Sequence, residues 1–180
     1  MPHMSLAIIG FGANDAVELG DPSEDMHVPL ALYRTNMENI IREFREHTPS
    51  ICLILVTPPT VDPLVWPNRC PQRTATYAQV VREVGEVVHV GVLDLWSVKE
   101  REHCVSVDVG VSDLCDGIHL GPLGNEKVGE HQILLHFHNN SLYYQSPHFP
   151  LHYSNLLMTL INIVSCSYHH VISLLHISLS

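Results

Sequence analysis

The feature that most constrains the fold is an alternation of apolar runs and amphipathic segments in the first half of the chain. Leu6–Phe11 and Ile51–Val56 are continuous apolar runs, as expected of parallel strands that are buried on both faces. A third run, Val87–Leu93, completes the series. Strand, helix, strand, helix, strand with right-handed crossovers predicts a three-layer α/β/α domain.

Two amphipathic helices are predicted between these strands. The first begins at Pro29, because the fixed φ of proline suits the start of a helix. Its apolar residues recur at helical spacing: Tyr33, Met37, Ile40, Ile41 and Phe44, while Arg34, Glu38, Arg42, Glu43 and Arg45 occupy other faces. The second helix follows the Pro58-Pro59 break and carries Tyr77, Val80, Val81 and Val84.

An acid and an imidazole lie three residues apart in the segment Asp116-Gly117-Ile118-His119. At this spacing the two side chains can meet across one turn, so that the carboxylate holds one ring nitrogen and stabilises the imidazolium. The other ring nitrogen can then act as a general base toward a hydroxyl nucleophile. The same spacing also occurs by chance, so the motif alone leaves a structural role open.

Asn14 offers complementary chemistry in Gly10-Phe11-Gly12-Ala13-Asn14-Asp15, which follows the first predicted strand. Its side-chain amide could donate a hydrogen bond to the oxyanion of a tetrahedral intermediate, worth about 3 kcal/mol in comparable sites. Asn-Asp after glycine is also typical of a simple turn. Because active sites of parallel sheets lie beyond the carboxyl ends of the strands, Asn14 and the Asp116 turn are predicted at one edge.

Five separated motifs occur in a fixed order: Gly12-Ala13-Asn14-Asp15, His27-Val28-Pro29-Leu30, Thr57-Pro58-Pro59-Thr60-Val61-Asp62, Leu93-Asp94-Leu95-Trp96, and Asp116-Gly117-Ile118-His119-Leu120 with Gly124-Asn125. From about Leu6 to about His131 this series resembles the SGNH (GDSL-type) hydrolases, particularly the isoamyl acetate-hydrolysing esterase group. The resemblance implies a flavodoxin-like α/β/α fold and a Ser-His-Asp hydrolase of short acyl esters of small alcohols. His119 matches the general base, Asp116 its acidic partner and Asn14 the oxyanion donor, and no metal or cofactor is implied.

No residue of this sequence matches the serine, which the family carries in a Gly-Asp-Ser block ahead of the Asn14 motif. The only Gly-Asp pair, Gly20-Asp21, follows Asn14 and precedes Pro22. Ser5 is expected at the opposite end of its strand from Asn14, and nothing places Ser112 on a sharp strand-to-helix turn. The sequence is therefore predicted to be an N-terminally truncated, incomplete domain with impaired catalysis.

In the family, a strand from ahead of the Asn14 motif pairs beside the strand that corresponds to Leu6–Phe11. Because this sequence lacks that part, the edge of Leu6–Phe11 is predicted to be unpaired, which implies marginal stability unless another segment covers it. This prediction gives an alternative function: a non-catalytic truncated isoform or binding protein that pairs with a partner chain through the exposed strand edge. For the esterase the expected partner is a small uncharged ester. Trp66 and the Pro58–Pro71 loop are expected either to line a substrate cleft or to form an exposed loop with a Trp anchor.

Composition changes abruptly near residue 131. All nine basic and 19 acidic residues precede His131, so residues 1–131 are predicted to be the partial hydrolase domain and 132–180 an uncharged tail outside the family fold. Four interpretations of the tail are open: a splicing or gene-prediction product, a membrane anchor within Leu156–Leu179, a metal site, or a cover for the sheet edge. The candidate metal ligands are His131, His136, His138, His169 and His170.

The net charge of −10 argues against a nucleic-acid or anionic-membrane surface. The odd number of cysteines and the lack of a Cys-x-x-Cys pair predict reduced thiols. Cys115 adjoins Asp116 and is interpreted as structural. Met1-Pro2-His3-Met4 carries no basic residue before the first strand, so no signal peptide and a cytoplasmic location are expected.

Overall fold

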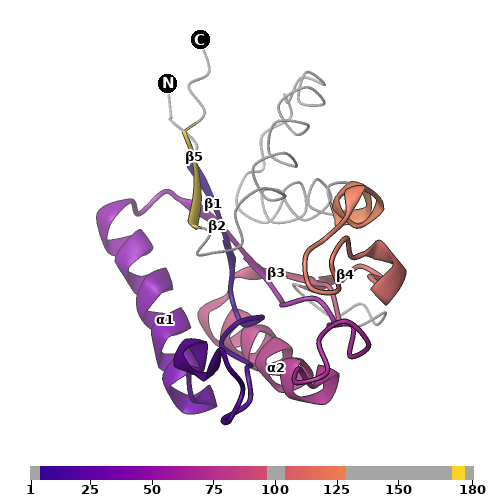
Figure 1. Cartoon of the computed structure of the whole chain (residues 1–180). Coiled ribbons are helices and arrows are strands. Elements are labelled where there is room, and N and C mark those ends of the chain that lie inside the picture. The colour runs from indigo at the N-terminus through magenta and orange to yellow at the C-terminus, as the bar shows by residue number, and fades with distance from the viewer. Residues whose placement is uncertain (1–4, 97–103, 129–171, 177–180) are drawn as a thin grey trace.

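The computed structural model describes residues 5–96, 104–128 and 172–176. Within them, five strands form one sheet in the order β4-β3-β2-β1-β5 (Figure 1). The strands are β1 (Ser5–Gly10), β2 (Cys52–Val56), β3 (Gly91–Asp94), β4 (Cys104–Ser106) and β5 (Ile172–His176). The first four strands run parallel. The α/β fold class predicted from the sequence is therefore confirmed.

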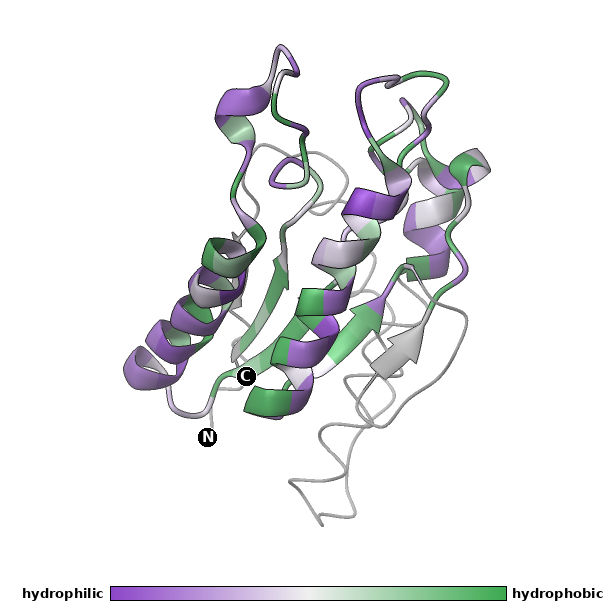
Figure 2. Cartoon of the chain, turned by 90° about the horizontal axis from the view of Figure 1, so that it is seen from below, coloured by the Kyte–Doolittle hydropathy of each residue, from purple (hydrophilic) through white to green (hydrophobic). Residues whose placement is uncertain are grey.

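Two long helices cover one face of the sheet, and both were predicted. They are α1 (Leu30–His47) and α2 (Pro71–Val88). Figure 2 shows their apolar faces turned toward the strands. The core beneath them combines alternate residues of β1 and β2 with buried helix residues: Ala7, Ile9, Leu53, Leu55, Tyr33, Met37, Ile41, Tyr77, Val80, Val81 and Val84. Each buried Val, Leu or Ile contributes about 1.5–3 kcal/mol by leaving water.

The opposite face of the sheet is covered by the segment between β4 and residue 128. The remaining alternate strand residues, Leu6, Ile8, Ile54, Val56 and Leu93, pack there against Leu95, Val107, Val109, Leu120 and Val128. This segment contains the short 3-10 helix η2 (Val111–Asp113), and residues 122–128 are helical. It therefore supplies the third layer and carries Asp116 and His119 with it.

The start of the third strand differs from the prediction. Val87 and Val88 belong to the last turn of α2, and Val87 is 70% exposed. The helix ends at Val88 and is capped by His89, which adopts a left-handed conformation with φ of 53°, and β3 begins only at Gly91. Two valines before a strand favoured an early start, but the helix periodicity continued through them.

The prediction that the outer edge of β1 is unpaired is wrong. Residues Ser5–Ile9 pair antiparallel with β5, in a register that joins Leu6 to Leu175 and Ile8 to Ser173. The sequence left open whether part of the tail covers this edge, and β5 does so. The domain boundary predicted near residue 131 stays a prediction. Five residues of the predicted tail, those of β5, pair with the sheet.

Several predictions lie outside the described residues. They concern the metal site at His131, His136, His138, His169 and His170 and most of the anchor segment Leu156–Leu179. In the part that the structure describes, no group of three or more His, Cys, Asp or Glu side chains is placed to hold a metal ion. Across the same residues, every helix is too short or too polar to cross a bilayer.

Candidate active site

Asn14 lies in a tight turn immediately beyond the carboxyl end of β1. Gly12 has φ of 116°, and a Cβ there would lie 3.0 Å from both the Pro58 side chain and the Tyr33 hydroxyl. Only glycine therefore fits this position. The carboxylate of Asp15 accepts a hydrogen bond of 3.0 Å from the Gly12 N–H, and the His27 Nδ1 lies 3.0 Å from the Asp15 carbonyl oxygen. The contacts of Asp15 with Gly12 and His27 therefore hold the conformation of this turn.

Asp116 and His119 meet as their spacing predicted. The Asp116 Oδ2 lies 2.5 Å from the His119 Nδ1, while Asp116 Oδ1 accepts hydrogen bonds from the backbone N–H groups of Ile118 (3.1 Å) and His119 (2.8 Å). Gly117, with φ of 84°, makes the turn that permits this closure. One carboxylate therefore both caps the turn and orients the imidazole.

The carboxylate of Asp116 is held in its ionised form. Burial acts to raise its pKa, but the hydrogen bonds from the His119 backbone and ring, the Ile118 N–H and the charge of His119 outweigh burial. The pKa of Asp116 is consequently lower than that of an ordinary aspartate. An ionised partner is what an imidazole needs in order to accept a proton during catalysis.

The loop between β2 and α2 joins the Asn14 turn to the Asp116 turn. The Asp62 N–H donates to the Gly117 carbonyl oxygen at 2.8 Å, and the Trp66 Nε1 donates to the Asp116 carbonyl oxygen at 2.8 Å. A Cβ on Gly117 would lie 2.9 Å from the Val65 Cβ. Asp116 therefore lies beside the loop that follows β2, at the carboxyl edge of the sheet where the sequence placed both turns.

Sequence reasoning missed Arg69, which reaches the other turn from the same loop. Its side chain donates to the Ala13 carbonyl oxygen at 2.7 Å and to the Asn14 Oδ1 at 3.3 Å. Arg69 is buried, although the stretch from Pro63 to Asn68 before it is exposed. An arginine in a Pro-rich loop carries no periodic signal, so only its contacts reveal it.

A buried ion pair lies beneath the carboxyl edge of the sheet. The pair and its hydrogen bonds involve two of the five motifs, those that contain Thr57 and Asp94. Asp94, at the end of β3, is fully buried, and the Arg82 Nη1 donates to both of its carboxylate oxygens at 3.0 Å. Thr57 bonds to Asp94 through Oγ1 at 3.2 Å, and the same oxygen accepts from the Leu95 N–H at 2.8 Å. These residues connect the ends of β2 and β3 beneath the candidate site.

The remaining candidates are placed as follows. Ser5 begins β1, whereas Asn14 follows the other end of that strand. Ser112 lies in η2. Gly20 and Asp21 lie in a turn in which the Gly20 N–H donates to the Glu24 carboxylate at 2.7 Å. Cys115 is exposed with a free thiol, and its N–H donates to the His119 carbonyl oxygen at 2.8 Å; its interpretation as structural stays a prediction.

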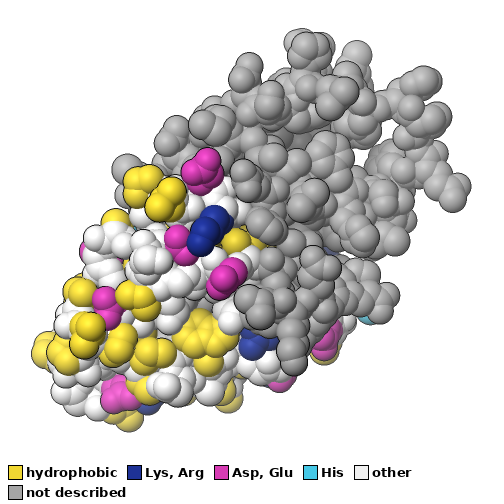
Figure 3. Space-filling view, turned by 90° about the vertical axis from the view of Figure 1, so that its right-hand side faces the viewer, with side chains coloured by type: hydrophobic (Ala, Val, Ile, Leu, Met, Phe, Trp, Pro, Cys, Tyr) yellow, Lys and Arg dark blue, Asp and Glu magenta, His cyan; other side chains and the backbone are white. Residues whose placement is uncertain are grey.

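Exposed apolar side chains lie in the loop that contacts the Asp116 turn. Leu64 is 92% and Val65 54% exposed, in the loop that contacts Gly117. Figure 3 shows a face of the molecule on which apolar side chains form a group, with acidic and basic side chains between them. An exposed apolar rim next to a polar turn favours ligands without charge.

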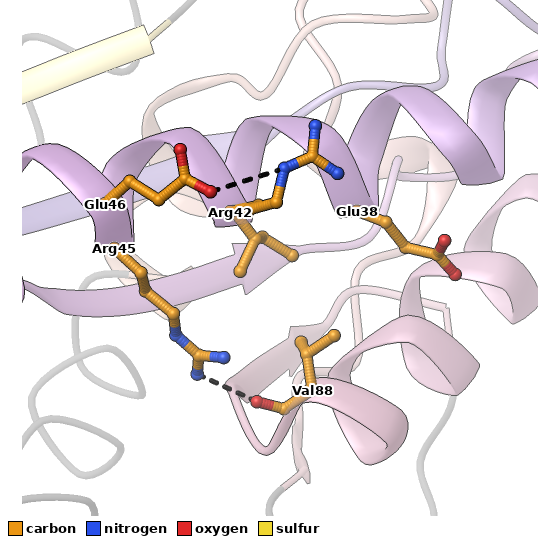
Figure 4. A pocket seen from close by; sticks show the side chains of 6 residues that line it. Glu38, Arg42, Arg45, Glu46 and Val88 are labelled. Atoms are coloured by element: carbon orange, nitrogen blue, oxygen red, sulfur yellow. Dashed lines mark hydrogen bonds and ion pairs between the residues drawn. The ribbon is translucent and has the colours of Figure 1, made fainter.

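A hollow elsewhere on the surface lacks the features of a reaction site. It lies between α1 and the end of α2 and is lined by Glu38, Ile41, Arg42, Arg45, Glu46 and Val88 (Figure 4). Its volume of about 280 Å³ lies at the lower end of the roughly 300–1,000 Å³ of ligand pockets. Arg42 pairs with Glu46 at 3.7 Å, and the Arg45 side chain donates to the Val88 carbonyl oxygen at 2.8 Å.

Comparison with known proteins decides the family. The sequence model of the GDSL-like Lipase/Acylhydrolase family matches residues 2–127, which include Asn14, Asp116 and His119. The chain belongs to the GDSL-like lipase/acylhydrolase family. The family predicted from the five motifs is thus confirmed, and the match ends close to the predicted compositional boundary.

Relatives of this GDSL-family chain include esterases of animals and plants. It is 34% identical over 134 residues to the isoamyl acetate-hydrolyzing esterase 1 homolog of Bos taurus, covering 68% of this chain and 52% of that protein. It is 30% identical over 135 residues to a GDSL esterase/lipase of Arabidopsis thaliana, covering 67% of this chain and 54% of that protein. The chain therefore spans about half the length of the relatives it matches.

A solved structure shows the same fold. The lipase/acylhydrolase of Enterococcus faecalis superposes with a TM-score of 0.50 and 27% sequence identity, covering 75% of this chain and 59% of that one. The described sheet and helices are consistent with part of the GDSL-family α/β fold.

Proposed function

We propose that this chain carries the acid-base and oxyanion parts of an esterase site that acts on short acyl esters of small alcohols. The observation that carries the proposal is the 2.5 Å contact between the Asp116 Oδ2 and the His119 Nδ1, made within the segment that matches the hydrolase family. The names of the relatives support the substrate class, and the exposed apolar side chains of Leu64 and Val65 suit an uncharged ester.

In the proposed reaction, His119 accepts the proton of a hydroxyl nucleophile as it attacks the ester carbonyl. Asp116 stabilises the imidazolium so formed, and His119 then returns the proton to the leaving alcohol. Asn14 donates a side-chain N–H to the oxyanion of the tetrahedral intermediate, which is worth about 2.7–4 kcal/mol where such a donor has been removed. No metal or cofactor enters these steps.

The absence of a residue that matches the nucleophilic serine limits the rate of hydrolysis expected of the 180-residue polypeptide alone. None of its residues matches the family serine, and a triad without one member retains only about 10³–10⁴-fold catalysis over water. We therefore expect weak hydrolysis from this polypeptide, and much faster hydrolysis after a Gly-Asp-Ser segment is joined ahead of residue 5. The rise depends on that segment pairing with β1 in place of β5.

The test is hydrolysis of p-nitrophenyl acetate by two purified polypeptides. One is the 180-residue chain, and the other is the same chain fused behind a segment that carries the Gly-Asp-Ser block of the family. The fusion is expected to be active, and His119→Ala should abolish its activity. His47→Ala is the matched control, because His47 is an exposed histidine of α1 and its loss should leave the rate unchanged. Activity that survives His119→Ala would contradict the proposal.

The alternative function, binding of a partner chain along the edge of β1, has no observation in its favour. A partner strand would compete with β5, which pairs with five residues of β1. The esterase site is therefore the better supported proposal.

A further inference from the structure

Arg69 holds the Asn14 turn through two hydrogen bonds, both donated by its guanidinium to oxygen atoms of that turn. Its Nη1 donates to the Ala13 carbonyl oxygen at 2.7 Å, and its Nη2 donates to the Asn14 Oδ1 at 3.3 Å. The residue is only 8% exposed, and its Cζ lies 5.7 Å from the ring centre of Trp66. The guanidinium is therefore fixed between an aromatic ring and the turn that carries Asn14.

The chemistry of the two groups fixes the orientation of the Asn14 amide. A guanidinium carries only N–H donors, whereas an asparagine side chain has one acceptor end and one donor end. If the amide were reversed, the Asn14 Nδ2 donors would face the Arg69 donors. The favourable arrangement directs Oδ1 toward Arg69 and leaves the Nδ2 donors directed away from it.

An oxyanion donor needs that orientation. An asparagine can stabilise a developing negative oxygen only with its N–H groups, and the benefit depends on these groups being held in place before the reaction. Asn14 is half-buried rather than packed in the core, so its amide would otherwise rotate. The positive charge of Arg69 also polarises the amide, which strengthens its N–H groups as donors.

We propose that Arg69 is a positioning residue that locks the Asn14 amide with its N–H groups directed at the oxyanion. The proposal rests on the proposed role of Asn14 as an oxyanion donor. It also gives the loop between β2 and α2 a defined task. One loop holds the oxyanion donor through Arg69 and the base-bearing turn through Trp66, whose Nε1 donates to the Asp116 carbonyl oxygen at 2.8 Å.

The decisive measurement is an NMR spectrum of the Asn14 side-chain amide in the 180-residue chain. Arg69→Lys keeps the charge but lacks the two-pronged donor, so the two Nδ2 proton signals of Asn14 are expected to move and broaden. The backbone amide signal of His119 should keep its position. Arg45→Lys is the matched control, since Arg45 also donates to a backbone carbonyl, that of Val88, and should leave Asn14 unchanged. Asn14 signals identical to those of the native chain, in a folded Arg69→Lys variant, overturn the proposal.

A second measurement covers the case in which Arg69→Lys does not fold. A crystal structure of the native chain should place the Arg69 guanidinium within hydrogen-bond distance of the Asn14 side chain. An Arg69 side chain directed into solvent there would overturn the proposal without any variant.

Turnover provides an independent readout in the serine-bearing fusion. Arg69→Lys should lower kcat, by at most the 10²–10³-fold that loss of an oxyanion donor causes, and leave KM nearly unchanged. In an Asn14→Ala background the same change should lower kcat no further, because Arg69 acts through Asn14. Absence of hydrolysis in every form would contradict the proposed function alone, since the Asn14 amide signals report on Arg69 without turnover.

Discussion

The indole N–H of Trp66 donates a hydrogen bond of 2.8 Å to the carbonyl oxygen of Asp116, fifty residues later in the chain. This bond ties the loop after β2 to the turn that pairs Asp116 with His119. Both partners are partly exposed, so the bond orients two loops rather than filling the core. The candidate site is thus set by contacts between loops at the carboxyl edge of the sheet, as expected for a parallel α/β sheet.

Trp66→Phe should loosen the Asp116 turn while keeping an aromatic ring beside Arg69. The lost hydrogen bond is expected to cost about 0.5–1.5 kcal/mol of unfolding free energy. Hydrogen exchange measured by NMR should become faster at the Ile118 and His119 backbone amides. Trp96→Phe is the control for loss of an indole N–H. Unchanged exchange at both amides would show that Trp66 does not hold the turn.

Gly85→Ala should destabilise the protein, although alanine is the better helix former. Gly85 lies within α2, where alanine alone would gain about 1 kcal/mol. A Cβ there would lie 2.3 Å from the Val92 Cγ2, and overpacking of this kind costs about 1–3 kcal/mol. Urea denaturation should show a net loss, and adding Val92→Ala should recover part of it. A more stable Gly85→Ala variant would contradict the close packing of α2 on β3.

The strongest sequence patterns predicted their elements well. Tyr33, Met37 and Ile41 recur at helical spacing and are all buried on α1, and the apolar run from Ile51 to Val56 contains β2. The start of β3 was misplaced because Val87 and Val88 favour strands yet end a helix. Strand β4 has only three residues, and β5 pairs with a strand far away in sequence, so neither left a local signal.

The contacts of the candidate site also include one that the sequence predicts and one that it does not. The Asp116–His119 contact follows from a spacing of three residues, which one turn closes, and local geometry therefore predicted it. Arg69 and Asn14 are 55 residues apart, and no pattern within either segment connects them. Their contact depends on how the loop after β2 returns over β1, which the sequence shows only once the fold is known.

Removing one partner of the buried Arg82–Asp94 pair should cause a large loss of stability. Arg82→Met leaves the Asp94 carboxylate, which is fully buried, without its cation, and such a loss costs about 3–5 kcal/mol. The double variant Arg82→Met/Asp94→Leu removes both charges and should be more stable than Arg82→Met alone. Urea denaturation measures both. A loss below about 1 kcal/mol for Arg82→Met would mean that the pair is not buried as described.

Stability in acid should depend on Asp113, which the Lys127 side chain and the Gly110 N–H hold in its ionised form. The Lys127 Nζ lies 2.7 Å and the Gly110 nitrogen 2.9 Å from the Asp113 Oδ2, and these hydrogen bonds lower the pKa of Asp113 below its ordinary value of 3.8. Because the folded pKa is the lower one, the group stabilises the fold fully above the unfolded pKa. This contribution disappears as pH falls through the folded pKa.

Asp113→Asn should therefore be less stable than the native chain at pH 7, and its stability should fall less steeply below about pH 4. The two curves of unfolding free energy against pH should converge at the acid end, where Asp113 is protonated in both the folded and unfolded native chain. Asp25→Asn, in the exposed 3-10 helix η1 (Glu24–Met26), removes the same charge away from Lys127 and should keep the native slope. Parallel curves for Asp113→Asn and the native chain would show that Lys127 does not stabilise the Asp113 carboxylate, and the fold of the segment between β4 and residue 128 would then need another explanation.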